Sequence, residues 1–226
     1  MPEVTCHGAG PVIAVMAKAP RPGCVKTRLL PMLSPEEAAE LHLAFLRDTL
    51  ARVLAVPSAR AAVVCPAADT DSLAACVLPG VTVQAQTGAG LSAALHFALG
   101  HFHALGHDPV LLLDSDSPHL PTRYLRRALT ELRESDLVVG PTDDGGYYLA
   151  GAHRPHPDLF EASSIGTDTA LSSLLRHAAD LRLRTALLPT WFDVDRPEDL
   201  SRLAAELHRD PGAAPETARC LSRRGL

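Results

Sequence analysis

The sequence predicts an α/β fold in which helices cover both faces of a mostly parallel sheet. Short apolar runs alternate with amphipathic segments along the 226 residues. These runs are continuous, as expected of strands that are covered on both faces. Helical segments separate them, as right-handed crossovers between parallel strands require. At this length and 46% hydrophobic content we expect a single domain, 1–226, with a core of about 11–207 and a surface tail over 208–226.

The elements follow in order along the chain. The first strand is expected at residues 11–17, an apolar run bounded by a glycine and a basic loop. A helix starts after Ser34, because Ser34, Pro35 and Glu37 form a capping pattern and apolar residues then recur at helical spacing. Further strands are expected at 61–65, 81–86, 109–113 and 136–139. Further helices are expected at 70–77, 91–105 and 122–133, after 165–169, after 195–197, and for a turn or two near 218–221.

Composition limits the classes of partner and the compartment. A net charge of -5 and a pI near 6.1 argue against a general nucleic-acid or membrane-surface binder. The five cysteines include no Cys-x-x-Cys pair, which argues against a disulfide framework or a zinc knuckle. No apolar stretch approaches transmembrane length. We therefore expect a cytoplasmic protein with no nucleic-acid or membrane partner. A homodimer is possible, and the sequence leaves the oligomeric state open.

A basic loop directly follows the first strand. Four cations fall within eleven residues and are spaced by two prolines and a glycine, which is typical of an ordered loop that holds an anion. The glycine spacing before Lys26 does not match a Walker loop. The candidate phosphate-binding residues are Ala17, Lys18, Arg21, Gly23, Lys26, Thr27 and Arg28. An ordinary basic surface loop remains the alternative at this point.

Two acids follow the most strand-like run in the chain. Asp114 and Asp116 stand where the strand at 109–113 ends, and hard carboxylate oxygens at such a position are ligands that Mg²⁺ prefers. A turn or helix cap would also use these residues. We favour a metal because charge beside a buried strand is costly without a partner.

Two later segments carry further acids. Asp143, Asp144, Gly145, Gly146 and Tyr147 follow a strand, and are expected to bind an acceptor or supply a base; the same residues also predict a β-hairpin.

The second segment is 191–200, in which acids alternate out of an apolar run. Asp193 and Asp195 fall on the same side of an extended chain, so either can complete the coordination of a metal held by Asp116. A helix cap at Asp195, ahead of Pro197, is the rival interpretation.

Together these segments resemble the DUF2064 family, a branch of the GT-A nucleotide-diphospho-sugar transferase superfamily related to the 2-phospholactate guanylyltransferases. The similarity runs from about residue 11 to 207 with the motifs in the family order. It implies a Rossmann-like three-layer α/β/α GT-A fold with a mostly parallel mixed sheet. It also implies nucleotide phosphates held by residues 18–28, with Lys18, Lys26, Arg28 and Asp116 in catalysis. Mg²⁺ or Mn²⁺ would sit on Asp116 with Asp195, and Asp114 is the third candidate ligand.

Two departures from the family pattern point in opposite directions. Asp114-Ser-Asp116 replaces the usual Gly-Ser-Asp and resembles the Asp-x-Asp of glycosyltransferases. The stretch from Gly88 instead resembles the Gly-Leu-Asn-x-Ala-Leu with which guanylyltransferases contact base and ribose. This resemblance extends the nucleotide-binding set to Gln86, Gly88, Gly90, Leu91 and Ser92.

Three functions are compatible with these motifs. In the first, an NMP group moves from a nucleoside triphosphate to a small phosphorylated or phosphonate acceptor, and pyrophosphate leaves; four loop cations suit a triphosphate. In the second, a nucleotide sugar donates its sugar to a hydroxyl acceptor, with Asp143 or Asp144 as base. The third is a nucleotide-binding protein without turnover. The base and the acceptor stay open.

Overall fold

The computed structural model describes residues 9–161 and 164–225. Seven strands form one sheet in the order β3-β2-β1-β4-β6-β5-β7. In the described chain, β6 alone runs antiparallel to its neighbours. The strands are β1 (Gly10–Met16), β2 (Arg60–Cys65), β3 (Val81–Ala85), β4 (His107–Leu113), β5 (Leu137–Pro141), β6 (Tyr147–Ala152) and β7 (Thr185–Leu187). The predicted mostly parallel mixed sheet is confirmed.

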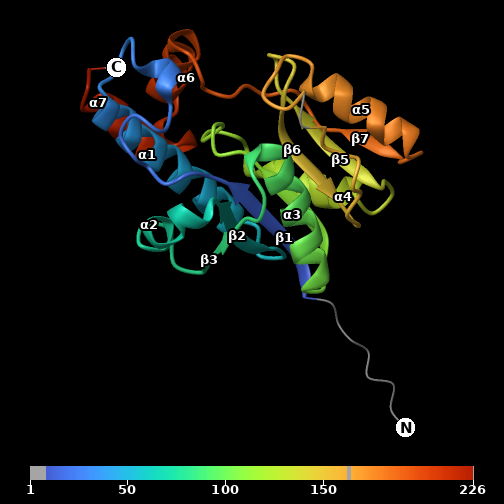
Figure 1. Cartoon of the computed structure of the whole chain (residues 1–226). Coiled ribbons are helices and arrows are strands. Elements are labelled where there is room, and N and C mark those ends of the chain that lie inside the picture. Colours follow the sequence, from blue (N-terminus) through green and yellow to red (C-terminus); the bar gives the residue numbers. More distant parts are fainter. Residues whose placement is uncertain (1–8, 162–163, 226) are drawn as a thin grey trace.

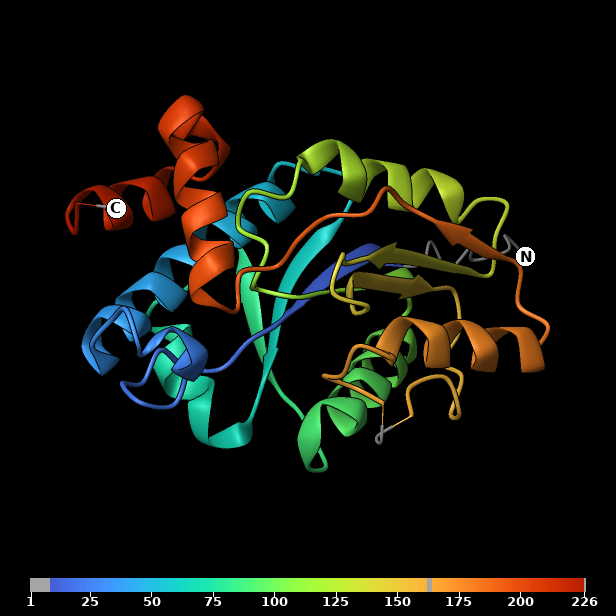
Figure 2. The ribbon, with the colours of Figure 1, turned by 90° about the horizontal axis from the view of Figure 1, so that it is seen from above.

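Helices cover both faces of this sheet (Figures 1 and 2). The α-helices are α1 (Pro35–Leu54), α2 (Thr70–Ala74), α3 (Gly90–Ala104), α4 (Thr122–Glu131), α5 (Ala170–Asp180), α6 (Pro197–Arg209) and α7 (Pro215–Ser222), and the short 3-10 turns are η1 (Thr27–Leu29), η2 (Ala67–Asp69) and η3 (Pro211–Ala213). One apolar core joins the sheet to α1 and α4, and a second joins its other face to α3 and α5. The three layers are therefore as predicted.

Strand β1 shows how one sequence run serves both cores. Ile13 and Val15 pack into the core with α1 and α4, whereas Val12 and Ala14 pack into the core with α3. Side chains alternate between the faces of a strand, so a continuous apolar run is needed where both faces are covered.

A hairpin joins β5 to the antiparallel β6, as the Asp-Gly pattern predicts. Gly145 in its turn has a φ of 90°, and a Cβ built there would lie 2.1 Å from the carbonyl oxygen of Asp168. Only glycine fits this close approach. The hairpin brings its polar turn back to the edge of the sheet at which β4 ends.

The surface tail predicted over 208–226 is wrong for residues 215–222. These residues form α7, and its Cys220 and Leu221 are buried in a third apolar core with α1 and α6. The carboxylate of Asp48 on α1 accepts hydrogen bonds from the N–H groups of Glu216 and Thr217, at 3.1 and 2.8 Å. A residue 168 positions away thus caps the helix, which no local pattern reveals. No helix in the described residues is long and apolar enough to cross a membrane.

Replacing Asp48 with alanine should lower the free energy of unfolding by about 2 kcal/mol, because two N–H groups at the start of α7 lose their acceptor. Chemical denaturation measures this. Glu36→Ala is the matched control: Glu36 is an exposed acid in the first turn of the same helix, and its loss should cost about 0.5 kcal/mol. Equal effects of the two variants would contradict the capping role.

Candidate functional site

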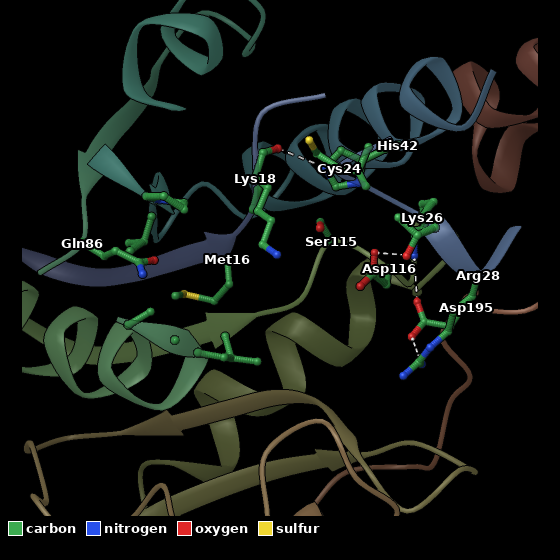
Figure 3. Close-up of a pocket in the computed structure, with 18 residues that line it drawn as sticks. Met16, Lys18, Cys24, Lys26, Arg28, His42, Gln86, Ser115, Asp116 and Asp195 are labelled. Atoms are coloured by element: carbon green, nitrogen blue, oxygen red, sulfur yellow. Dashed lines mark hydrogen bonds and ion pairs between the residues drawn. The ribbon is translucent and has the colours of Figure 1, made fainter. Parts of the chain in front are cut away.

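A cavity of about 520 Å³ opens at the carboxyl ends of β1 and β2. Ligands of open α/β sheets bind at this edge. Ten of the candidate residues identified in the sequence line it: Ala17, Lys18, Lys26, Thr27, Arg28, Gln86, Gly90, Leu91, Asp116 and Asp195. The basic loop and the acids from two distant segments thus face one space (Figure 3).

Lys26 joins these segments. Its Nζ lies 2.5 Å from Oδ1 of Asp116, 3.1 Å from Oδ1 of Asp195 and 2.7 Å from the carbonyl oxygen of Val194. The side chain is only 4% exposed. Arg28, which is more than half exposed, approaches Asp195 from outside, with Nη1 3.0 Å from Oδ2. The two carboxylates therefore share one buried ammonium.

Both partners of this buried pair are charged. Burial alone would lower the pKa of Lys26, but Asp116 and Asp195 outweigh it and the pKa is raised above its usual value. Burial likewise favours a neutral Asp116, but Lys26, together with His42 and Lys18, outweighs it, and the pKa of that carboxyl is lowered. Charge pairing thus offsets desolvation on both sides.

The acid-bearing segments are tied to each other behind the cavity. The N–H of Val194 donates to the carbonyl of Asp116 at 2.9 Å, and the hydroxyl of Ser117 donates to the carbonyl of Phe192 at 3.2 Å. The ring of His119 packs on Phe192 with centroids 4.3 Å apart. These contacts set the distance between Asp116 and Asp195.

Asp195 does not cap α6. Oδ2 of Asp199 accepts the N–H groups of Asp195 and Arg196, at 3.2 and 2.8 Å. The carboxylate of Asp195 is left to the two cations. At the other acidic segment, Oδ1 of Asp114 accepts the N–H of Asp116 at 3.2 Å, so the turn expected there is made by Asp114.

Four predicted nucleotide-binding residues lie outside the cavity lining: Arg21, Gly23, Gly88 and Ser92. Arg21 pairs with Asp69, with Nη1 2.9 Å from Oδ1. The Ser92 hydroxyl donates to the carbonyl of Phe160 at 2.7 Å. The side chains of Arg21 and Ser92 thus bind other segments and do not face the cavity.

His42 of α1 lines the cavity, although sequence reasoning missed it. Its Nε2 donates to the carbonyl oxygen of Lys18 at 3.0 Å, which fixes the backbone where the basic loop begins. Burial lowers the pKa of His42. Its place on an otherwise apolar helix face offered no signal beyond a polar residue facing the core.

A second cavity of about 330 Å³ adjoins the first and shares Arg28, Asp116 and Asp195 with it. Five further candidate residues line it: Asp114, Asp144, Gly146, Tyr147 and Asp193. Asp143 and Gly145 lie outside the lining. Asp143 pairs with Arg202, with Oδ2 2.7 Å from Nη1.

Carboxylates crowd the second cavity. Burial first, then Asp116 and Asp193, raise the pKa of Asp114 well above its usual value. Burial, with Asp144 and Asp195, raises the pKa of Asp193 to about 7. Oδ1 of Asp144 accepts both the hydroxyl of Thr142, at 2.6 Å, and the N–H of Gly146, at 3.0 Å. In the described residues, no three acidic, histidine or cysteine side chains form a ready metal cluster.

Comparison with known proteins places the chain in a family. The DUF2064 family, described as an uncharacterized protein conserved in bacteria, matches residues 49–167, more than half of the chain. The chain belongs to the DUF2064 family. A phosphoenolpyruvate guanylyltransferase of Mycolicibacterium vanbaalenii is 30% identical over 240 residues, covering 95% of each protein. One of Chloroflexus aurantiacus is 29% identical over 203 residues, covering 84% of this chain and 94% of that protein.

A solved structure has the same fold. A Desulfovibrio desulfuricans G20 protein assigned to the nucleotide-diphospho-sugar transferases superposes on this DUF2064 protein with a TM-score of 0.87. The two are 30% identical, and the match covers 95% of each chain. The GT-A-like fold is confirmed, and so is the expectation of a transferase.

His119 predicts acid sensitivity of the DUF2064 protein. The side chain is buried, and burial, then Arg52 and Arg202, lower its pKa to about 3. The unfolded chain binds a proton at this residue near pH 6.5, so stability is lost as pH falls from 6.5 toward 3. His119→Phe should remove about 1.4 kcal/mol per pH unit from the slope of unfolding free energy in this window.

Urea denaturation at pH 7, 5.5 and 4.5 measures that slope. His103→Gln replaces an exposed histidine of α3 and should keep the wild-type slope. An unchanged slope in His119→Phe would mean that other groups govern acid unfolding.

Proposed function

We propose that this DUF2064 protein is a divalent-cation-dependent nucleotidyltransferase. It moves an NMP group from a nucleoside triphosphate to a small acceptor that carries a phosphate or phosphonate, with release of pyrophosphate. One observation carries the proposal: Lys18, Lys26 and Arg28 line a single cavity together with Asp116 and Asp195. The guanylyltransferase activity named for two relatives supports it.

The two cavities suit two substrates. The larger has apolar walls and the Gln86 amide at one end, for the nucleoside, and the loop cations at the other, for the phosphates. Figure 3 shows the Lys18 side chain pointing into this space. The smaller cavity, beside Asp144 and Tyr147, takes the acceptor. Since Arg28, Asp116 and Asp195 line both, the reacting groups meet there.

Asp116 and Asp195 have the donor set for Mg²⁺ or Mn²⁺. Their hard oxygens converge from two segments. Burial, and then the neighbouring carboxylates, raise the pKa values of Asp114 and Asp193, and a divalent cation would favour the charged form of these acids. Asp116 and Asp195 would hold the ion, with Asp114 beside them. When bound, it supplies neutralisation of polyphosphate charge.

The chain's own residues account for the transfer. An acceptor phosphate oxygen is already ionised, so it attacks the α-phosphorus without a general base. The bond from the α-phosphorus to the bridging oxygen breaks, and pyrophosphate leaves with those electrons. Lys18, Lys26 and Arg28 stabilise the charge that develops on the phosphoryl oxygens. The apolar walls of the cavity orient the nucleoside.

Glycosyl transfer is the second candidate, favoured by the assignment of the Desulfovibrio protein. An inverting transfer needs a free carboxylate base at the acceptor. Asp143 faces away, toward Arg202, and Oδ1 of Asp144 already accepts two hydrogen bonds. Nucleotidyl transfer, which needs no base, therefore fits the site better.

Product analysis separates the two candidates. The protein is incubated with Mg²⁺, each of the four ribonucleoside triphosphates and a panel of phosphate and phosphonate acceptors. We expect acceptor-dependent release of pyrophosphate. Nucleoside diphosphate release from a sugar nucleotide, without pyrophosphate from any triphosphate, would instead establish the glycosyltransferase.

Asp116→Asn should slow acceptor-dependent pyrophosphate release by about 10²-fold or more, because it removes charge at the reacting groups. It should also abolish the part of the triphosphate-induced rise in Tm that depends on Mg²⁺. Asp180→Asn, at the exposed end of α5, is the matched control and should behave like the wild type. A retained magnesium response in Asp116→Asn would remove Asp116 from the metal site.

A further inference from the structure

Lys26 occupies an unusual position for a phosphate-binding lysine. Its backbone is left-handed, with φ 48° and ψ 38°, a conformation that non-glycine residues rarely adopt. Its side chain is nearly excluded from solvent and lies over the ring of Phe45, 5.3 Å from the centroid. Lys18, eight residues earlier in the same loop, is exposed. Lys26 is thus held inward, toward the acids.

The hydrogen-bond and ion-pair partners of the Lys26 ammonium are all oxygens. Two carboxylates and the carbonyl of Val194 approach Nζ at 2.5 to 3.1 Å. Hard oxygens of this kind are also the ligands that a magnesium ion takes from proteins. The Lys26 ammonium and the Arg28 guanidinium together balance the charge of the two carboxylates, so a divalent cation placed beside the ammonium would meet repulsion.

We propose that the Lys26 ammonium is the counter-ion that holds the divalent-cation position between Asp116 and Asp195, and that it yields this position when a polyphosphate binds. This inference rests on the proposed function. The polyphosphate offers Lys26 a new anionic partner in the same cavity, which Arg28 and Lys18 also line. Cation and nucleotide therefore bind interdependently, each raising the affinity for the other by the same factor.

Loss of Lys26 should strengthen, not weaken, the binding of the metal ion alone. In the absence of nucleotide, wild-type protein should bind Mn²⁺ weakly, because the ion must displace a paired ammonium. Lys26→Met removes the competitor and leaves both carboxylates, so Mn²⁺ should bind about tenfold or more tightly than to wild type. Titration followed by the electron paramagnetic resonance signal of free Mn²⁺ measures this without any turnover.

A second arm measures the coupling. Inorganic tripolyphosphate is used at constant free Mn²⁺, so the result does not depend on the nucleotide base. In wild type, tripolyphosphate should raise the affinity for Mn²⁺; in Lys26→Met this increase should be reduced, because the exchange no longer takes place. Equal or weaker Mn²⁺ binding by the variant without tripolyphosphate would overturn the proposal.

Controls separate charge removal from damage to the fold. Arg133→Met removes an exposed cation that lines neither cavity and should leave Mn²⁺ binding in the absence of tripolyphosphate near the wild-type value. If Lys26→Met does not fold, Lys26→Gln makes the same test with a polar neutral side chain. Thermal unfolding reports folding for every variant. Failure of pyrophosphate release would refute the proposed function without altering the Mn²⁺ comparison, so the two failures are distinguishable.

Discussion

The buried ammonium of Lys26 between Asp116 and Asp195 is the constraint on which the site depends. Three segments meet at this point: the loop after β1, the turn after β4 and the stretch before α6. Burial, and then repulsion from Asp116 and Asp193, raise the pKa of Asp114 well above its usual value and favour its protonation. Lys26 keeps Asp116 charged where burial would neutralise it. Charge pairing between distant segments of the chain therefore completes the site.

The sheet supplies the frame for that meeting. β1 and β4 are parallel neighbours, so their carboxyl ends, and the loops that follow them, lie side by side. The stretch before α6 reaches the same edge from β7. The backbone N–H of Trp191 donates to the carbonyl oxygen of Pro141 at the end of β5, and the carbonyl oxygen of Trp191 accepts the backbone N–H of Asp143. The antiparallel β6 turns the hairpin back, which places Asp144 on the second cavity. Backbone pairing thus places each acid at this edge of the sheet, and the Lys26 ammonium binds two of them, Asp116 and Asp195.

The sequence predicted the strands and the loops of the site better than the ion-pair and hydrogen-bond partners of individual side chains. The apolar run at 11–17, the hairpin and the placement of the basic loop all follow from local patterns and from the rule for strand ends. Partner choice does not, because it depends on residues far apart in the chain: Arg21 turns to Asp69, Asp143 to Arg202, and Asp48 caps a helix 168 residues later. Burial of α7 also depends on packing against α1 and α6, which are distant in sequence from it or weakly apolar, so its own short sequence does not indicate that it is buried.

The charges of the two cavities limit where an acceptor phosphate can bind. Among the described residues, Arg28 is the one lysine or arginine that lines the smaller cavity, and it is already paired with Asp195. The remaining charged groups there are carboxylates, so an anion deep in that cavity would be unpaired and repelled. Counter-charge is available only at the boundary with the larger cavity, near Lys26 and Arg28. Under the proposed function, repulsion from one side and attraction from the other hold the acceptor phosphate at the place where the α-phosphorus arrives.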